Sequence, residues 1–302
     1  MTESGITAWR GRWTEFGIEM LIRVLGVASI GLMILIFVFL LREGLPAFLQ
    51  VPVSNFWGTR WYPTFDLYGS VPLLLGSTLV TVVAIVIALP LGVATAVFVR
   101  EVAPSWAREI LKPMIEVLAG IPSVVLGFFG MTIVAPFVRT ALGAPTGLTA
   151  LTGALILAYM ALPTIISVAE DALDAVPKSY RDAGLAMGAT QWQTIWRVVV
   201  PAARSGIVTA AMLGMGRAIG ETMAVMMVTG NAARLPLSLD SLLRPVRTMT
   251  ATVAAEMGEV AQGSTHYHVL FGLGIILFVL TFIINLAAAS TIFRKKRRGG
   301  LR

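Results

Sequence analysis

Arg217 and Glu221 lie inside an otherwise apolar stretch, GRAIGETMAV, at residues 216–225. On a continuous helix a spacing of four residues puts both side chains on one face, where they can pair. A charge near the middle of a membrane costs roughly 2.5–3.5 kcal/mol on insertion scales, so such residues face a protein interior or a watery cavity. A guanidinium stays charged and matches oxyanion oxygens with paired donors. We expect Arg217 to bind an oxyanion transiently and Glu221 to hold the arginine in place. The alternative is that the two residues form a purely structural ion pair.

The segment that carries these charges is one of six that could cross a membrane. The chain has 302 residues, of which 57% are hydrophobic and 13% charged, and its mean hydropathy of +0.83 indicates an integral membrane protein. A membrane helix needs about 20 apolar residues. The candidate spans are residues 24–41, 71–99, 117–138, 140–169, 206–229 and 269–293. We therefore predict an all-α membrane protein with six transmembrane helices. The first helix is expected to be retained, because residues 1–23 are long for the basic region of a signal peptide.

The basic residues predict the orientation of these helices. If the N-terminus is cytoplasmic, most of the 23 Lys and Arg fall in segments on the cytoplasmic side, as membrane proteins prefer. Both termini are therefore expected in the cytoplasm. The chain has a net charge of +7, and five basic residues, RKKRR at residues 294–298, directly follow the last predicted helix. This position favours contact of the basic residues with anionic lipid over binding of nucleic acid.

The sequence lacks the motifs of several kinds of catalytic and nucleotide-binding site. The sequence contains no GxxxxGK[ST], so the chain has no P-loop for ATP, and it contains no G-x-S-x-G, no H-E-x-x-H and no cysteine. His266 and His268 form an H-x-H near Glu256 and Glu259. Two His at this spacing, without further ligands, are more typical of interfacial residues than of a metal site. We predict a transport subunit that is not an enzyme and that itself binds no metal or cofactor.

The connection between the fourth and fifth spans has local structure of its own. Pro177 opens it, residues 182–187 have the pattern of a short helix that Gly188 ends, and TQWQ at residues 190–193 has the form of a capping box that starts a second helix. Two tryptophans, Trp192 and Trp196, lie in this solvated unit. They favour a docking site for a cytoplasmic partner; packing back against the helix ends or the lipid headgroups is the alternative.

Two hydroxyl residues beside prolines are further candidates for a substrate pathway. Ser123 follows Pro122, and Thr164 follows Pro163. Proline frees backbone carbonyls that can face a cavity. A local bond from the hydroxyl to the backbone explains both residues equally well.

The connection at residues 177–204 also carries a family resemblance. Asp182-Ala183-Gly184, Gly188 and the VVVP that ends at Pro201 resemble the EAA loop of ABC importer permeases, E-A-A-x3-G-x9-I-x-L-P, with the same spacing. The departures are mild: Asp182 stands for Glu, Gly184 for Ala, and two valines for Ile and Leu. The resemblance implies that this loop transmits closure of an ATPase to the membrane helices.

Longer stretches resemble the phosphate-specific ABC transporter permeases of the PstC type. They are AGIPSVVLGFFG at residues 119–130, ALPTIISVAEDAL at 161–173, GRAIGETMAV at 216–225 and ATVAAEMGEV at 251–260. The resemblance covers roughly residues 61–293. It implies the type I ABC importer permease fold and a place in the bacterial cytoplasmic (inner) membrane. It also implies a phosphate pathway that includes Arg217 and Glu221, and we add Thr222, the next residue of the same stretch, as a candidate.

The same resemblance implies the partners. A PstA-type permease completes the pathway as a heterodimer, two PstB-type ATPase subunits bind ATP and Mg in the cytoplasm, and a PstS-type protein delivers phosphate outside. Residues 1–70 then hold the first helix and an outer loop, residues 71–293 the permease domain, and residues 294–302 a basic cytoplasmic tail. Three other functions stay open: an ABC permease for another oxyanion or small solute, a secondary transporter or channel that needs no ATPase, and a sensor or scaffold that no longer transports.

Overall fold

The computed structural model describes the backbone of residues 4–299 and the side chains of residues 16–286 apart from residue 239. Over this part of the chain the fold is helical, with one two-stranded hairpin. The longer helices are α1 (Ser4–Gln50), α3 (Val71–Val97), α4 (Ser105–Ala119), α7 (Ala150–Asp174), α10 (Val200–Gly220) and α13 (Thr265–Gly299). The shorter ones are α2 (Val53–Phe56), α5 (Ser123–Phe129), α6 (Ala135–Leu142), α8 (Lys178–Ala186), α9 (Gln191–Thr194), α11 (Met223–Val228) and α12 (Met249–Glu256).

Strands and single helical turns complete the fold. The strands are β1 (Trp61–Tyr62) and β2 (Leu67–Tyr68), which pair antiparallel. The 3-10 turns are η1 (Pro63–Phe65) and η5 (Leu239–Leu243). The π-helical turns are η2 (Phe98–Val102), η3 (Gly130–Val134) and η4 (Ile195–Val199).

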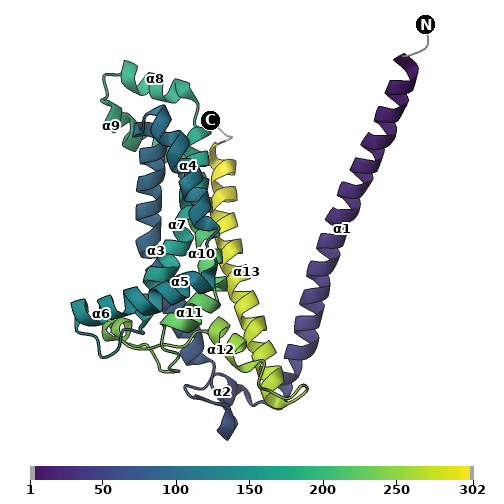
Figure 1. The fold of residues 1–302 in the computed structure, drawn as a ribbon, viewed down its shortest axis with the longest axis vertical. Helices are drawn as coiled ribbons and strands as arrows, with labels where there is room; N and C mark the ends of the chain where they lie inside the picture. Colours follow the sequence, from purple (N-terminus) through teal and green to yellow (C-terminus); the bar gives the residue numbers. More distant parts are fainter. Residues whose placement is uncertain (1–3, 300–302) are drawn as a thin grey trace.

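The centre of the fold is a bundle of α3, α7 and α10, with α13 beside them (Figure 1). Small residues fill the contact between α3 and α7, where Ala84 and Ala88 belong to one buried cluster with Ala154 and Ala161. In a membrane, helices associate through close packing, so small side chains at the contact let the backbones approach. The close packing of the bundle therefore fixes the positions of the side chains on α7 and α10.

Helix α1 leans away from this bundle and approaches it only near its C-terminal end (Figure 1). There it packs against α13, and Gly44 lies directly against Phe271 and Ile275. Residues 16–39 of α1 are exposed, although most of them are apolar. A helix that is apolar all round needs apolar surroundings, which lipid or another membrane subunit would provide.

Six segments of the described chain are long and apolar enough to cross a membrane. They are Phe16–Gln50, Val71–Val102, Ser123–Leu142, Ala150–Asp174, Gln191–Gly220 and Thr265–Leu286. The predicted all-α fold with six candidate spans is confirmed; the first span is longer than expected, and the third, fourth and fifth are displaced along the chain.

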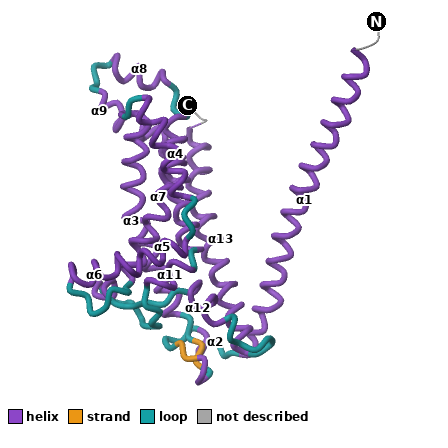
Figure 2. The backbone as a smooth tube through the Cα atoms, in the orientation of Figure 1, coloured by secondary structure: helices purple, strands orange, loops and turns teal. Residues whose placement is uncertain are grey.

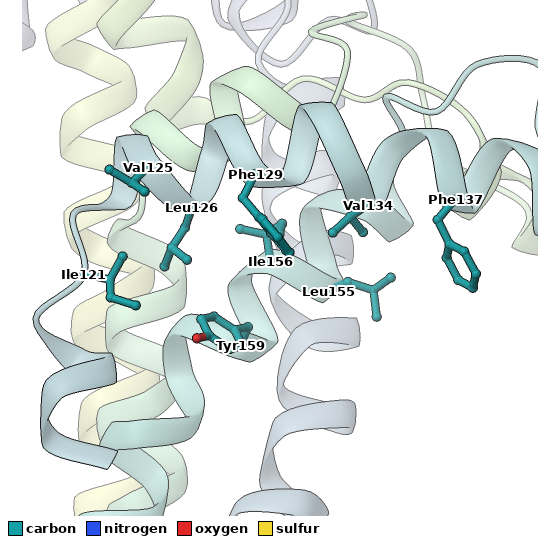
Figure 3. Close-up of a pocket in the computed structure, with 9 residues that line it drawn as sticks. All are labelled: Ile121, Val125, Leu126, Phe129, Val134, Phe137, Leu155, Ile156 and Tyr159. Carbon is teal, nitrogen blue, oxygen red and sulfur yellow. The ribbon is translucent and has the colours of Figure 1, made fainter. Parts of the chain in front are cut away.

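The third span is not one straight helix over residues 117–138. Helix α4 ends at Ala119, and the chain turns at residues 120–122 before α5 begins at Ser123. Pro122 cannot donate the backbone bond that would continue a helix, and it restricts the residue before it. Helix α4 packs along α7, whereas α5, η3 and α6 run across α7 (Figures 1 and 3).

The fourth and fifth spans are shifted towards the end of the bundle where α8 and α9 lie. Residues 140–149 are not the start of α7, because Gly143 takes a left-handed conformation (φ 63°) and ends α6. Helix α7 begins after the Thr149 cap and continues through Glu170 to Asp174. The fifth span stops at Gly220 and does not continue to residue 229.

The two ends of the bundle carry different elements (Figures 1 and 2). Helices α8 and α9 lie at the same end as the beginning of α1 and the end of α13. That end is the one that the basic residues assign to the cytoplasm, and the assignment stays a prediction. The β1–β2 hairpin, α2 and most loops lie at the opposite end. Helix α12, which packs against α3, α11 and α13, lies there as well.

Candidate substrate-pathway site

Helix α10 ends inside the GRAIGETMAV stretch. Gly220 is its last residue, Glu221 has an extended backbone (φ −70°, ψ 134°), and α11 begins at Met223. Glycine is the least favourable helix residue after proline, so a break here is inexpensive. Gly216 and Gly220 have no atom within 4 Å of the position where a Cβ would lie. The last turn of α10 therefore borders open space on one face.

Arg217 lies in this last turn and contacts two other helices. Its Nη1 donates to Oγ1 of Thr164 at 3.3 Å, and its Nη2 donates to the carbonyl oxygen of Ala119 at 3.2 Å. Thr164 is near the middle of α7, so the guanidinium lies near mid-depth of the bundle. Ala119 is the last residue of α4, where the helix dipole leaves a partial negative charge. Both acceptors are neutral, and Arg217 remains exposed in the single chain.

The expected helical pairing of Arg217 with Glu221 is wrong. Glu221 Oε1 accepts from the backbone N–H of Ala224, in the first turn of α11, at 3.3 Å. Its carbonyl oxygen accepts from Oγ1 of Thr250, in α12, at 2.9 Å. An i, i+4 pair needs a continuous helix, and the chain leaves the helix at Gly220. Glu221 thus joins α10, α11 and α12, and the contacts that hold Arg217 come from α4 and α7.

Of the other predicted pathway residues, Thr222 lies in the break between α10 and α11, and Ser123 lies at the start of α5. Thr222 Oγ1 donates to the carbonyl oxygen of Gly220 at 3.3 Å, which is the kind of local hydroxyl-to-backbone bond considered above for Ser123 and Thr164. Ser123 is the first residue of α5, four positions after Ala119. The structure therefore brings Arg217 and Thr164 together with the end of α4.

An apolar cavity of about 580 Å³ lies between α7 and the α5–α6 segment (Figure 3). Its walls include Ile121 and Leu126 on one side and Ile156 and Tyr159 of α7 on the other. Tyr159 carries the only side-chain oxygen among the nine labelled residues. An oxyanion would lose its hydration there and gain almost no partners, which is unfavourable. The cavity is therefore unsuited to an anion, and Arg217 is the better candidate.

The predicted two-helix unit precedes α10. Pro177 is the N-cap of α8, which is longer than the expected residues 182–187, and Gly188 ends it with a left-handed conformation (φ 79°). Thr190 Oγ1 accepts from the N–H of Gln193 at 3.2 Å, and Gln193 Oε1 accepts from the N–H of Thr190 at 3.0 Å. The capping box and the glycine end are confirmed, because such signals act between near neighbours in the chain.

The surface of this unit is partly aromatic. Trp192 and Trp196 are 60% and 42% exposed and contact each other edge to face, with ring centroids 5.7 Å apart. Asp182 is exposed as well. A Cβ on Gly184 would lie 3.0 Å from the side chain of Thr194, so α8 touches α9 where this sequence has glycine in place of alanine. The exposed tryptophans favour the docking interpretation over packing against the helix ends.

Some residues around these sites carry no signal of their own in the sequence. Ala119 acts through a backbone carbonyl, and only the Gly-Ile-Pro at residues 120–122 indicated that a helix could end beside it. Lys112 donates to Glu170 Oε2 at 2.8 Å, and this bond raises the pKa of Lys112. Glu170 is 5% exposed. In the sequence, Glu170 is recognisable only as the first charged residue after an apolar run.

Comparison with known proteins now identifies the family. Residues 88–299 match the model of the family described as binding-protein-dependent transport system inner membrane component. The chain belongs to this family. The chain is similar to the probable ABC transporter permease protein YqgH of Bacillus subtilis (strain 168). The two share 39% identity over 283 residues, which are 92% of this chain and 91% of the relative. It is also similar to the phosphate transport system permease protein PstC of Mesorhizobium japonicum, with 38% identity over 259 residues, 80% of this chain and 78% of the relative.

Solved structures of two transporters share the fold of this inner membrane component. An inward-facing form of the MetNI methionine ABC transporter aligns with a TM-score of 0.59 and 20% identity, covering 78% of this chain and 99% of that chain. A bacterial ABC transporter involved in the import of alginate aligns with a TM-score of 0.60 and 13% identity, covering 93% and 98%. At such identities the alignments establish the fold alone. The type I ABC importer permease fold that the family resemblance implied is confirmed.

Proposed function

We propose that this chain is a permease subunit of an ATP-driven phosphate importer and that Arg217 contacts phosphate during passage. The observation that carries the proposal is the exposed guanidinium of Arg217, held near mid-depth by Thr164 and the carbonyl oxygen of Ala119. Arginine has five N–H donors in a fixed fork, so these two contacts leave donors for the oxygens of an anion. Its two acceptors are neutral and do not cancel its charge.

Both the chemistry of the guanidinium and the names of similar proteins support phosphate as the substrate. A guanidinium pairs with phosphate through two parallel N–H···O bonds, which adds geometric selectivity to the attraction of opposite charges. Relatives named as phosphate transport system permease proteins match 80% of this chain at 38% identity and 82% at 34%. Thr164 and Ser123 are candidate neutral contacts on the same path, and Glu221 and Thr222 border it at the break after α10.

A second permease is needed to close the pathway. The face of α10 at Gly216 and Gly220 is open in the single chain, and Arg217 is exposed. In this proposal a PstA-type permease covers that face, so phosphate passes between the two chains. Each transport cycle then exposes Arg217 to one side of the bacterial inner membrane and afterwards to the other.

The energy comes from partner subunits. Because the sequence has no P-loop, ATP and Mg bind to a PstB-type ATPase dimer, which docks on α8 and α9 around Asp182, Ala183, Gly184 and the exposed tryptophans. This places α8, α9 and both termini in the cytoplasm, while a PstS-type protein releases phosphate at the opposite end. Pro201, at the start of α10, lies where the movement of the loop enters the membrane helix.

The test is ATP hydrolysis and uptake by the reconstituted complex of both permeases, the ATPase and the binding protein in proteoliposomes. Phosphate is expected to stimulate hydrolysis and to be imported, whereas sulfate and molybdate at equal concentration are expected to do neither. This chain alone in liposomes is expected to move no phosphate. Equal responses to the three anions would remove phosphate from the proposal, and uptake by the chain alone would replace the ATP-driven importer with a secondary transporter or channel.

A further inference from the structure

Helix α8 is attached to the membrane bundle mainly through polar contacts. None of its residues is buried, so apolar burial contributes little to holding it. Its contact with α9 at Gly184 and Thr194 ties it to the beginning of the fifth span, because α9, η4 and α10 follow one another without a break over Gln191–Gly220. Arg181, in the middle of α8, adds a second attachment, to the ends of two other helices.

Arg181 binds two different parts of the bundle at once. Its Nη2 and Nε donate to both carboxylate oxygens of Glu101, at 2.6 and 3.1 Å. Its Nη1 donates to the carbonyl oxygen of Val176 at 2.7 Å, and Nη2 also donates to that of Leu173 at 3.0 Å. Glu101 belongs to η2, which continues α3, while Leu173 lies in the last turn of α7. One guanidinium therefore connects α8 to the ends of α3 and α7.

The surroundings of this contact make it stiff. The side chains of Arg181 and Glu101 are 20% and 9% exposed, and a bidentate pair of this kind has a defined geometry. Arg100, the neighbour of Glu101, pairs with Asp174 of α7. Glu101 also lies in a π-helical turn, a local irregularity that is common at functional positions. The ends of α3 and α7 are thus tied to each other as well as to α8.

We propose that Arg181 and Glu101 form the joint through which displacement of α8 moves α3 and α7, beside the direct continuation of α9 into α10. The inference rests on the proposed function, since it assumes that an ATPase pushes on α8 and α9. Arg181 is a positioning residue: it touches neither substrate nor nucleotide. Through α7 the joint leads to Thr164, which holds Arg217, so a movement at α8 reaches the proposed phosphate contact along one continuous helix.

The experiment measures how much ATP the complete complex hydrolyses for each phosphate imported into proteoliposomes. Arg181→Lys keeps the charge but loses the bidentate geometry, and Glu101→Gln keeps the shape but loses the charge. Each is expected to raise the ratio of ATP to phosphate about fivefold or more, the lower range of typical coupling between sites, with an unchanged yield of assembled complex. The reversed pair, Arg181→Glu with Glu101→Arg, restores an ion pair between α8 and η2 but not the two bonds to the carbonyl oxygens of Leu173 and Val176, so it is expected to recover part of the coupling.

Lys178→Gln is the matched control, because Lys178 is an exposed cation on the same helix; it is expected to keep the wild-type ratio. The joint is disproved if the two single variants keep that ratio, or if the reversed pair is no better than the single variants. It is also disproved if uptake, hydrolysis and yield fall together, since a folding defect would do that. In these cases wild-type uptake leaves the proposed function standing, whereas a wild-type complex that imports no phosphate overturns both.

Discussion

Arg217 and Ala119 are 98 positions apart in the chain, and Nη2 of the arginine donates to the carbonyl oxygen of the alanine at 3.2 Å. This bond joins the last turn of α10 to the end of α4. An anion that reaches the guanidinium competes with a neutral acceptor, and it adds the attraction of opposite charges, which the carbonyl oxygen of Ala119 lacks. Binding of an anion is therefore expected to release the end of α4.

Replacing Arg217 tests whether paired donors or only a positive charge is needed. Arg217→Ala is expected to abolish phosphate uptake, and Arg217→Lys to lower it about ten- to hundredfold, because a charged hydrogen bond is worth about 1.5–3 kcal/mol. Both variants should assemble, since Arg217 is exposed in the single chain. Initial rates of uptake in proteoliposomes measure the effect, and a lysine variant with wild-type rates would remove the need for a guanidinium.

Reversing the two charges tests the geometry of the break after α10. Arg217→Glu combined with Glu221→Arg is expected to restore neither uptake nor thermal stability. An arginine at position 221 cannot accept the N–H of Ala224 as Glu221 does, and a glutamate at 217 cannot donate to the carbonyl oxygen of Ala119. Melting temperatures of the single and double variants in detergent provide the comparison. A double variant more stable than either single one would show that the two residues pair after all.

Gly188 is expected to matter because of its backbone. Its φ of 79° is left-handed, which costs a residue with a Cβ about 1–2 kcal/mol, although nothing lies within 4 Å of the place for a Cβ. Gly188→Val should therefore distort the end of α8 and raise the amount of ATP hydrolysed per phosphate imported. Gly258→Val is the matched control, since Gly258 has equally open surroundings and no such φ. Equal effects of both substitutions would rule out the backbone explanation.

The contact between Lys112 and Glu170 attaches α4 to α7. Lys112→Ala leaves the carboxylate of Glu170, which is 5% exposed, without this partner. Breaking a buried pair costs about 3–5 kcal/mol, and about half of that is expected here because Lys112 is 44% exposed and partly screened by water.

A second substitution at the same contact separates charge from packing. Lys112→Ala with Glu170→Leu removes both charges, and apolar replacements of buried pairs are often neutral or stabilising. The double variant is therefore expected to melt at a higher temperature than Lys112→Ala alone. If it is equally unstable or less stable, the loss comes from packing of the side chains rather than from an unpaired carboxylate.

Local features of this protein could be predicted from the sequence because their causes act between near neighbours. Hydropathy identified six spans, the left-handed glycine ended α8, and the reciprocal bonds of Thr190 and Gln193 started α9. The EAA-like spacing also indicated the family that residues 88–299 match. Each of these signals is complete within a few residues or within one apolar run.

Long-range contacts were decided by the tertiary structure. The spacing of Arg217 and Glu221 predicts a pair only if the helix continues, and glycines that allow a break do not say that one occurs. One of the two acceptors of Arg217 is a backbone carbonyl that no side chain marks, and Arg181 meets Glu101 from 80 positions away. By itself the sequence determined how many apolar segments could cross a membrane and which of their residues carry charge. Only the packing of α4, α7 and α10 decided which atoms those charges meet, because a side chain finds its partner through the positions of whole helices.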